Sequence, residues 1–283
     1  VIVPAMSHTA TSHAVEYNGA KAIFVDINSI TGNINPEEIK KKITKKTKAI
    51  IPVHFSCSTG EIEKIFSYAK RKNLRVIEDA AHAFGTIRKG KKIGSFGDIT
   101  CFSFDGIKNI TSGEGGCLVS NDKHVIKLSK DIRLLGVSNE SNKRYSGHRS
   151  WINDVKVQGW RYHMSDINAA IGRAQLTRFN FLINKRRELC KYYDQLFTSN
   201  DKIKIFKRNY KFEAPHIYLV RIPGLKKREL VRKKMQKFGI QTGIHYYPGY
   251  KFTKYKQDKK SFPNSEKIFK EIITLPLHPD LTR

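Results

Sequence analysis

One lysine, Lys108, lies between an aromatic strand-like run and a glycine-rich turn in the stretch CFSFDGIKNITSGEGG. A lysine amine attacks an aldehyde only when it is neutral, so burial or neighbouring cations must lower its pKa from about 10.4. Phe102 and Phe104 could supply that burial, and the glycines permit close approach of the backbone to a ligand. In so basic a chain an exposed loop lysine is the commoner reading, and Lys108 alone does not decide between the two.

A carboxylate precedes this lysine at the end of another strand-like run. The segment LRVIEDAAHAFG places Asp79 at a strand end and His82 three residues later, and open parallel sheets bind ligands at the carboxyl ends of their strands. Such a carboxylate could orient a histidine, bind a metal or hold the protonated nitrogen of a heterocycle; a helix cap or a salt bridge is the alternative. Ser103 adds a hydroxyl donor for a phosphate. The conjunction of Asp79 with Lys108 favours a chemical site.

The elements that must position these residues read as an α/β fold. Short β-rich runs (VIVP, AIFVDI, AIIPVHF, LRVIED, ITCFSF) alternate with amphipathic helical segments, which predicts a mainly parallel sheet covered by helices. From the N-cap candidate Ser165 the pattern predicts one long helix, straight or bent. Beyond it, KIKIF, PHIYLVRIP and QTGIHYY read as strands and KKRELVRKKMQKFG as a helix. We expect a large domain over residues 1–185 and a small α+β domain over residues 186–283.

Charge and composition restrict the class of protein. The net charge of +28 is an electrostatic signature of nucleic-acid binding, but the lysine runs are spread along the whole chain of 283 residues. Neither a groove-reading helix nor a stacking platform is apparent, so we expect no nucleic-acid partner and a general attraction for anionic small molecules. No apolar run approaches the roughly 18 residues of a membrane span, and VIVPAMSHTA is unlike a signal peptide. We therefore expect a cytoplasmic protein with no membrane partner.

The four cysteines are scattered without a CxxC pair. This spacing argues against both a disulfide framework and a zinc site, so we expect no metal.

Five separated blocks resemble, in order and spacing, one enzyme family. They are EDAAHAFG, GKKIGSFGDITCFSFDGIKNITSGEGGCLVSND, GWRYHMSDINAAIGRAQLTRF, GIQTGIHYYPGY and LPLHPDLT. Together they resemble the DegT/DnrJ/StrS family of sugar aminotransferases, which use pyridoxal 5′-phosphate (PLP). The resemblance covers essentially the whole chain. It implies fold type I, in which helices sandwich a mainly parallel sheet and a small α+β C-terminal domain follows.

The resemblance assigns cofactor roles to four of the residues. Lys108 matches the lysine that holds PLP covalently and later moves a proton, and Asp79 matches the partner of the pyridine nitrogen. Ser103 matches a phosphate-binding serine. His82 stands at a position, often glutamine in the family, beside the ring and its 3′ oxygen.

Four further residues are expected around the bound molecules. His8 falls where family members often stack an aromatic ring on PLP, although a surface or capping role is the alternative. His245 and Tyr246 resemble substrate-side residues, although HYYP also fits a packed strand end. In the block GWRYHMSD, either Arg161 or His163, depending on the alignment, replaces an asparagine that many members carry. The family works as a homodimer in which the partner chain contributes this block to the phosphate site.

Two departures from the family pattern qualify the resemblance. Asp105, between Ser103 and Lys108, places a carboxylate near the expected phosphate, which it would repel unless it points away. Family members begin tens of residues earlier and add a terminal helix after LPLHPDLT. We therefore expect both domains to be incomplete at their outer ends and PLP to bind more weakly than in an extended chain.

The resemblance predicts transfer of an amino group, from glutamate, to a keto group of a nucleotide-linked sugar. The product would enter surface polysaccharide or antibiotic sugar biosynthesis. Related sugar dehydratases carry histidine in place of Lys108, so the lysine favours transamination. The alternative is a PLP-binding regulator or an inactive family member.

Overall fold

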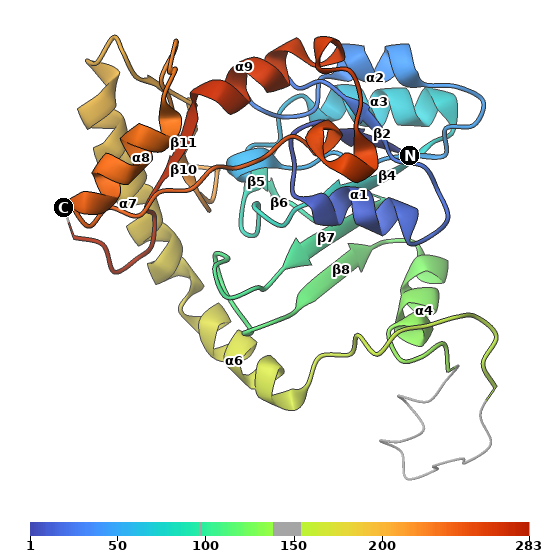
Figure 1. The fold of residues 1–283 in the computed structure, drawn as a ribbon. Helices are drawn as coiled ribbons and strands as arrows, with labels where there is room; N and C mark the ends of the chain where they lie inside the picture. Colours follow the sequence, from blue (N-terminus) through green and yellow to red (C-terminus); the bar gives the residue numbers. More distant parts are fainter. Residues whose placement is uncertain (97, 138–153, 283) are drawn as a thin grey trace.

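Two β-sheets organise the computed structural model, which describes residues 1–96, 98–137 and 154–282 (Figure 1). The strands of the larger sheet are β1 (Ile2–Pro4), β2 (Ile23–Val25), β3 (Ala49–Ile50), β4 (Arg75–Asp79), β7 (Ile99–Ser103) and β8 (Gly116–Ser120). They lie in the order β2-β1-β3-β4-β7-β8. Every neighbouring pair is parallel except β7 and β8, which are antiparallel. The predicted α/β class with a mainly parallel sheet is confirmed.

Helices and one small hairpin lie between these strands along the chain, and a further helix follows β8. The helices are α1 (Thr9–Glu16), α2 (Pro36–Lys42), α3 (Ile62–Lys72) and α4 (Lys123–Ile132), and the hairpin pairs β5 (Ile87–Arg88) with β6 (Lys91–Lys92). In α3, Ile62, Ile65 and Ala69 recur at helical spacing and are buried. The helix ends at Asn73, which takes a left-handed conformation with φ of 51°. Sequence periodicity and the end signal therefore agree for this helix.

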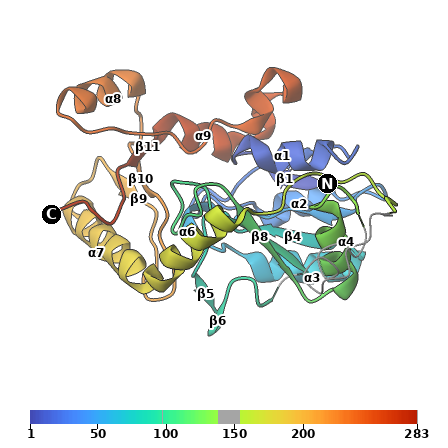
Figure 2. The same cartoon turned by 90° about the horizontal axis from the view of Figure 1, so that it is seen from below.

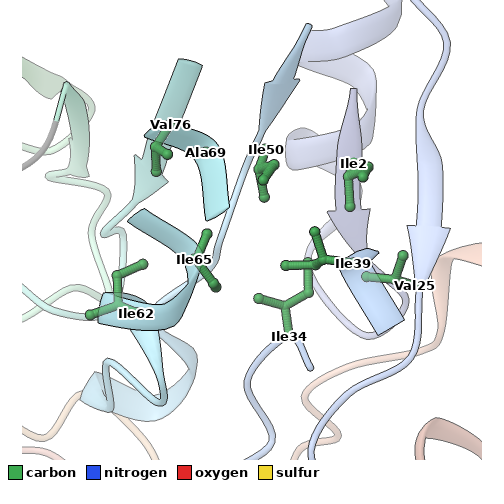
Figure 3. Close-up of a cluster of buried hydrophobic side chains, with 9 residues drawn as sticks. All are labelled: Ile2, Val25, Ile34, Ile39, Ile50, Ile62, Ile65, Ala69 and Val76. Atoms are coloured by element: carbon green, nitrogen blue, oxygen red, sulfur yellow. The ribbon is translucent and has the colours of Figure 1, made fainter. Parts of the chain in front are cut away.

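The alternation of side chains along each strand divides the larger sheet into two apolar faces. On one face Ile2, Val25 and Ile50 pack against Ile39 of α2 and Ile65 of α3, and all five are buried. Figure 3 shows these side chains pointing from the strands and from the helices into one cluster. This cluster holds α2 and α3 against the sheet.

The opposite face is covered by α1 and by a segment from the far end of the chain. Val3 and Phe24, each adjacent to a residue of the first face, contact Val15 of α1 and the rings of Tyr250 and Phe262. The backbone N–H of Gly249 also donates to the carbonyl of Ala5 over 2.8 Å. The C-terminal segment is thus part of the core beneath β1 and β2.

The second sheet is antiparallel and stands apart from the first (Figure 2). Its elements and the helices around it are α6 (Asp166–Thr177), α7 (Phe179–Thr198), β9 (Lys204–Ile205), β10 (Tyr218–Arg221), α8 (Arg228–Lys237), α9 (Pro263–Glu271) and β11 (Ile272–Leu275). The long predicted helix is bent, because α6 and α7 meet at Arg178. Its predicted N-cap is confirmed, since the Ser165 hydroxyl accepts from the N–H of Asn168 over 3.2 Å.

The structure differs from the expected strands at residues 241–247. The strand predicted at QTGIHYY is wrong: residues 241–247 form no strand, and only Gly243 bridges to Thr274. The chain leaves the sheet after this bridge, and His245 and Tyr246 line a cavity beside the larger sheet. The boundary predicted at residues 185 and 186 lies inside α7 and stays a prediction. Among the described residues, no helix is both long and apolar enough to cross a membrane.

Candidate active site

A cavity of about 570 Å³ opens at the carboxyl ends of the parallel strands. It is lined by residues that follow β1 and β3, by the ends of β4 and β7, by α1, and by loop residues near β10 and after α8. Seven predicted site residues line it: His8, Asp79, His82, Ser103, Lys108, His245 and Tyr246. Arg161 does not; it is exposed and bridges Leu134.

Asp79 is held rigidly at the end of β4. Its Oδ2 accepts from the Thr11 hydroxyl over 2.8 Å, and its Oδ1 accepts from the N–H of Ala81 over 3.2 Å. Thr11 in turn lies 3.1 Å from the hydroxyl of Ser7. Asp79 also helps burial to raise the pKa of the Cys101 thiol to about 11.

Lys108 lies in a turn after β7, and its environment favours a neutral amine. Partial burial lowers the Lys108 pKa, while the charges of Asp105 and Asp79 oppose that shift. The Asp105 carboxylate accepts from the N–H of Ile107 over 3.0 Å, and the N–H of Lys108 donates to the Asp105 carbonyl over 3.0 Å. Asp105 therefore bonds to its own loop through its side chain and also lines the cavity.

His82 and Tyr246 form the third fixed part of the site. Their Nε2 and Oη atoms lie 2.6 Å apart, and the two rings are nearly parallel at 27°. Burial, followed by the charges of Lys108, His245 and His8, keeps the pKa of His82 well below its usual value. His82 is therefore a neutral imidazole whose pocket-side nitrogen is already engaged by a tyrosine.

His8 and His245 each line the cavity and also contact another group of the protein. His8 caps α1, because its Nδ1 accepts from the N–H of Ala10 over 3.2 Å, and its ring meets the ring of Tyr246 edge-on. His245 lies 2.8 Å from the Thr274 hydroxyl through Nδ1, and burial lowers its pKa to about 4. The capping contact of His8 is thus present together with a place on the cavity wall.

Among the cavity-lining residues that no motif marked are two hydroxyl residues and a histidine: Ser7, Thr11 and His216. The hydroxyls of Ser7 and Thr11 lie four residues apart, as on one helical face, and this spacing was the available signal. His216 is 4% exposed, its ring centre lies 4.5 Å from that of His82, and its Nδ1 has no hydrogen-bond partner among the described residues. No local pattern marks His216, because tertiary packing alone brings it to the cavity.

A buried hydrogen-bond network lies behind Asp79. His54 Nε2 lies 2.8 Å from Glu78 Oε2, and the Thr100 hydroxyl donates to Glu78 Oε1 over 3.0 Å. The N–H of His54 also donates to the carbonyl of Asp79 over 3.0 Å. Glu78 is completely buried, so the strand end that carries Asp79 is anchored from the inner side.

Solved structures share this fold over nearly the whole chain. Spr1654 of Streptococcus pneumoniae, solved in a PLP form, superposes with a TM-score of 0.89 at 29% identity, covering 99% of this chain and 76% of that one. PseC of Helicobacter pylori, an aminotransferase involved in pseudoaminic acid biosynthesis, gives a TM-score of 0.90 at 28% identity, covering 99% and 75%. Fold and site together define a PLP-dependent aminotransferase of fold type I.

The sequence places the chain within one group of these enzymes. The profile of the DegT/DnrJ/EryC1/StrS aminotransferase family matches residues 1–283, and the chain belongs to that family. It is 38% identical to the uncharacterized protein MJ1066 of Methanocaldococcus jannaschii and 31% identical to the spore coat polysaccharide biosynthesis protein SpsC of Bacillus subtilis. Each comparison spans the whole of this chain and 75% of the relative. The chain is therefore a PLP-dependent sugar aminotransferase.

The donor set in the cavity fits PLP. A carboxylate fixed by two donors, Asp79, suits a protonated ring nitrogen, and the Lys108 amine with its lowered pKa suits an aldehyde carbon. The Ser103 hydroxyl, at the end of β7, is a donor of the kind that a phosphate accepts. A volume of about 570 Å³ is ample for the cofactor and part of a substrate.

Proposed function

We propose that the chain transfers an amino group from glutamate to a keto group of a nucleotide-linked sugar. One observation carries the proposal: Lys108, whose pKa is lowered by burial, shares a cavity with an Asp79 carboxylate that Thr11 and Ala81 hold in place. The likeness to PseC, involved in pseudoaminic acid biosynthesis, and to SpsC, a spore coat polysaccharide biosynthesis protein, supports a sugar product that enters surface polysaccharide. The net charge of +28 favours the approach of an anionic nucleotide. A cytoplasmic location stays a prediction.

The residues of the cavity divide the chemistry between them. PLP, when bound, supplies an electron sink that lets a proton leave the carbon next to the transferred nitrogen. Lys108 Nζ, because it is neutral over a wider pH range than a surface lysine, can accept that proton and return it. Asp79 would keep a proton on the ring nitrogen of PLP, and Ser103 would hold its phosphate. His8 would lie against the cofactor ring, and His245 would contact the substrate.

We further propose that a second copy of the chain completes the site. Apolar side chains are exposed along α6, α7 and β8, the edge strand of the larger sheet: Leu118 36%, Ile167 75%, Ile171 42%, Leu176 54% and Phe181 55%. A hollow of about 520 Å³ along α6 is lined mostly by small and apolar side chains, from Ala170 to Thr177. The amide of Asn168 donates to the Glu114 carbonyl over 2.9 Å, which ties α6 to the loop before β8. A homodimer would cover this face, and Arg161 would then reach the partner's phosphate site.

Covalent trapping tests the proposal. The protein is incubated with PLP, reduced with borohydride and digested, and the modified lysine is located by mass spectrometry. We expect modification of Lys108 alone, and its loss when glutamate is added before reduction. Labelling spread over many surface lysines would contradict an organised site.

A matched pair of variants separates the site from general lysine reactivity. Lys108→Ala is expected to abolish transamination of a nucleotide-linked ketosugar, whereas Lys64→Ala, in an exposed ion pair with Glu61, is expected to leave it unchanged. Trapping at Lys108 with no turnover of any nucleotide-linked ketosugar would favour a PLP-binding regulator instead.

A further inference from the structure

A hydrogen-bond chain leads from a backbone turn to a tyrosine hydroxyl at the cavity wall. The N–H of Ser56 donates to His82 Nδ1 over 3.4 Å. On the other side of the ring, His82 Nε2 lies 2.6 Å from Tyr246 Oη. His82 is 4% exposed, and Tyr246 lines the cavity together with Lys108 and Asp79. These hydrogen bonds therefore link the turn at Ser56 to the cavity.

The turn that supplies the first donor is strained and strongly tethered. Ser56 and Cys57 both take left-handed conformations, with φ of 49° and 68°, which cost about 1–2 kcal/mol each for residues other than glycine. The Ser56 hydroxyl donates to the Ile217 carbonyl over 3.1 Å, and Arg208 Nε donates to the Ser56 carbonyl over 3.2 Å. The Thr86 hydroxyl donates to the Cys57 carbonyl over 3.3 Å. These contacts fix the direction of the Ser56 N–H.

The number of protons on the His82 ring determines the direction of its hydrogen bond with Tyr246. His82 is neutral, because burial and three neighbouring basic groups lower its pKa, so its ring carries a single N–H. Its Nδ1 accepts from Ser56, so the proton lies on Nε2 and is donated to Tyr246 Oη. The Tyr246 hydroxyl is then the acceptor in that bond, and its own proton has no acceptor among the described residues.

We propose that Tyr246 donates its hydroxyl proton in a hydrogen bond to an oxygen atom of the molecule bound in the cavity. His82 and the Ser56 turn act as positioning residues that fix this direction. The inference deepens the proposed function and rests on it for the identity of the acceptor. That acceptor is an oxygen of either the cofactor ring or the keto group of the sugar.

The direction of the hydrogen bonds through His82 can be tested on protein without cofactor. Protein labelled with ¹⁵N-histidine is studied by long-range ¹H–¹⁵N correlation NMR between pH 6 and 8, and the His82 signals are assigned from their loss in His82→Gln. We expect the neutral tautomer protonated at Nε2 throughout this range. The tautomer protonated at Nδ1, or a doubly protonated ring, would overturn the proposal whether or not the protein is an aminotransferase.

Removal of the hydroxyl tests the donated bond. Tyr246→Phe keeps the ring, and Tyr247→Phe is the matched control, because Tyr247 is 45% exposed and is not part of the cavity lining. A tenfold rise in the PLP dissociation constant for Tyr246→Phe only would place the acceptor on the cofactor. Unchanged PLP binding with a tenfold lower kcat/KM, measured with the nucleotide-linked ketosugar that wild type converts fastest, would place it on the sugar.

If neither quantity changes in Tyr246→Phe, the proposal is wrong. If wild type itself binds no PLP, the proposed function fails. The tautomer measurement still decides whether His82 donates its hydrogen bond to Tyr246.

Rescue by a conservative variant separates positioning from packing. His82→Gln retains an N–H that can donate to Tyr246, whereas His82→Leu does not. We expect the Gln variant to stay within about threefold of wild type in the quantity that Tyr246→Phe changes, and the Leu variant to match Tyr246→Phe. Equal losses in both variants, with both folded by circular dichroism, would contradict the positioning role.

Discussion

The behaviour of Lys108 follows from where its side chain lies rather than from its residue type. The chain carries 53 lysines and arginines, and most of these are solvated. Lys108 differs because the cavity wall removes part of its water, while Asp79 and Asp105 limit how far its pKa falls. A single residue thereby acquires nucleophilic character that its neighbours in the sequence lack.

Lys108 is expected to react with amine reagents at lower pH than surface lysines do. Its pKa is lowered by burial, so its neutral fraction at a given pH is larger than that of Lys64, whose pKa is raised by Glu61. Reductive methylation of cofactor-free protein from pH 6 to 10, followed by peptide mass spectrometry, gives a midpoint for each lysine. A Lys108 midpoint at or above that of Lys64 would contradict the assignment.

Thr11 is expected to support cofactor binding through Asp79. Thr11→Val keeps the shape of the side chain but removes the donor 2.8 Å from Asp79 Oδ2. A hydrogen bond to a charged group contributes about 1.5–3 kcal/mol, so PLP affinity should fall by about tenfold or more. Spectroscopic titration with PLP measures this effect. Thr9→Val is the control, because Thr9 is not part of the cavity lining, and an equal loss there would indicate a general effect on α1.

Among the elements, those with strong periodicity could be predicted from the sequence, and those that depend on distant contacts could not. The helix α3 could be predicted because its apolar residues recur at helical spacing and Asn73 marks its end. The strand β4 could be predicted from the short run RVIED. By contrast, residues 241–247 have strand composition, yet His245 and Tyr246 within this segment line the cavity beside the larger sheet. Seven of the eight predicted site residues line that cavity, because the family motifs mark them. The resemblance could not show how Thr11 or His216 pack.

The end of β4 is expected to lose stability when its buried partner is removed. His54→Leu would remove the imidazole nitrogen that lies 2.8 Å from the carboxyl group of the completely buried Glu78. We expect this change to lower the free energy of unfolding by about 3 kcal/mol. Urea denaturation measures the change. The double variant His54→Leu/Glu78→Gln should recover part of this loss, because a buried amide costs less to leave without the His54 partner than a buried carboxyl group does. A loss of less than about 0.5 kcal/mol in the single variant would show that the pair does not anchor the strand.

At the scale of the whole molecule, the exposed apolar face of α6 is expected to hold two copies together. Ile167→Arg/Ile171→Arg places two charges on this face, where the side chains are 75% and 42% exposed. We expect the wild type to be dimeric and the variant monomeric in light scattering at micromolar concentration. Leu230→Arg on α8, where the side chain is 48% exposed, is the control and should leave the dimer intact. A monomeric wild type would contradict the proposed interface.

The path of the chain around the cavity has a consequence for biosynthesis. The cavity wall begins at Ser7 and is closed by Tyr246, and Gly249 bonds to Ala5 beneath it. Contacts so distant in sequence form slowly and cannot form on a partly synthesised chain. A nascent polypeptide leaving the ribosome would therefore expose the first strands and the reactive lysine long before the wall closes. Cofactor capture is expected to follow synthesis of the segment that carries Tyr246 rather than synthesis of the Lys108 turn alone.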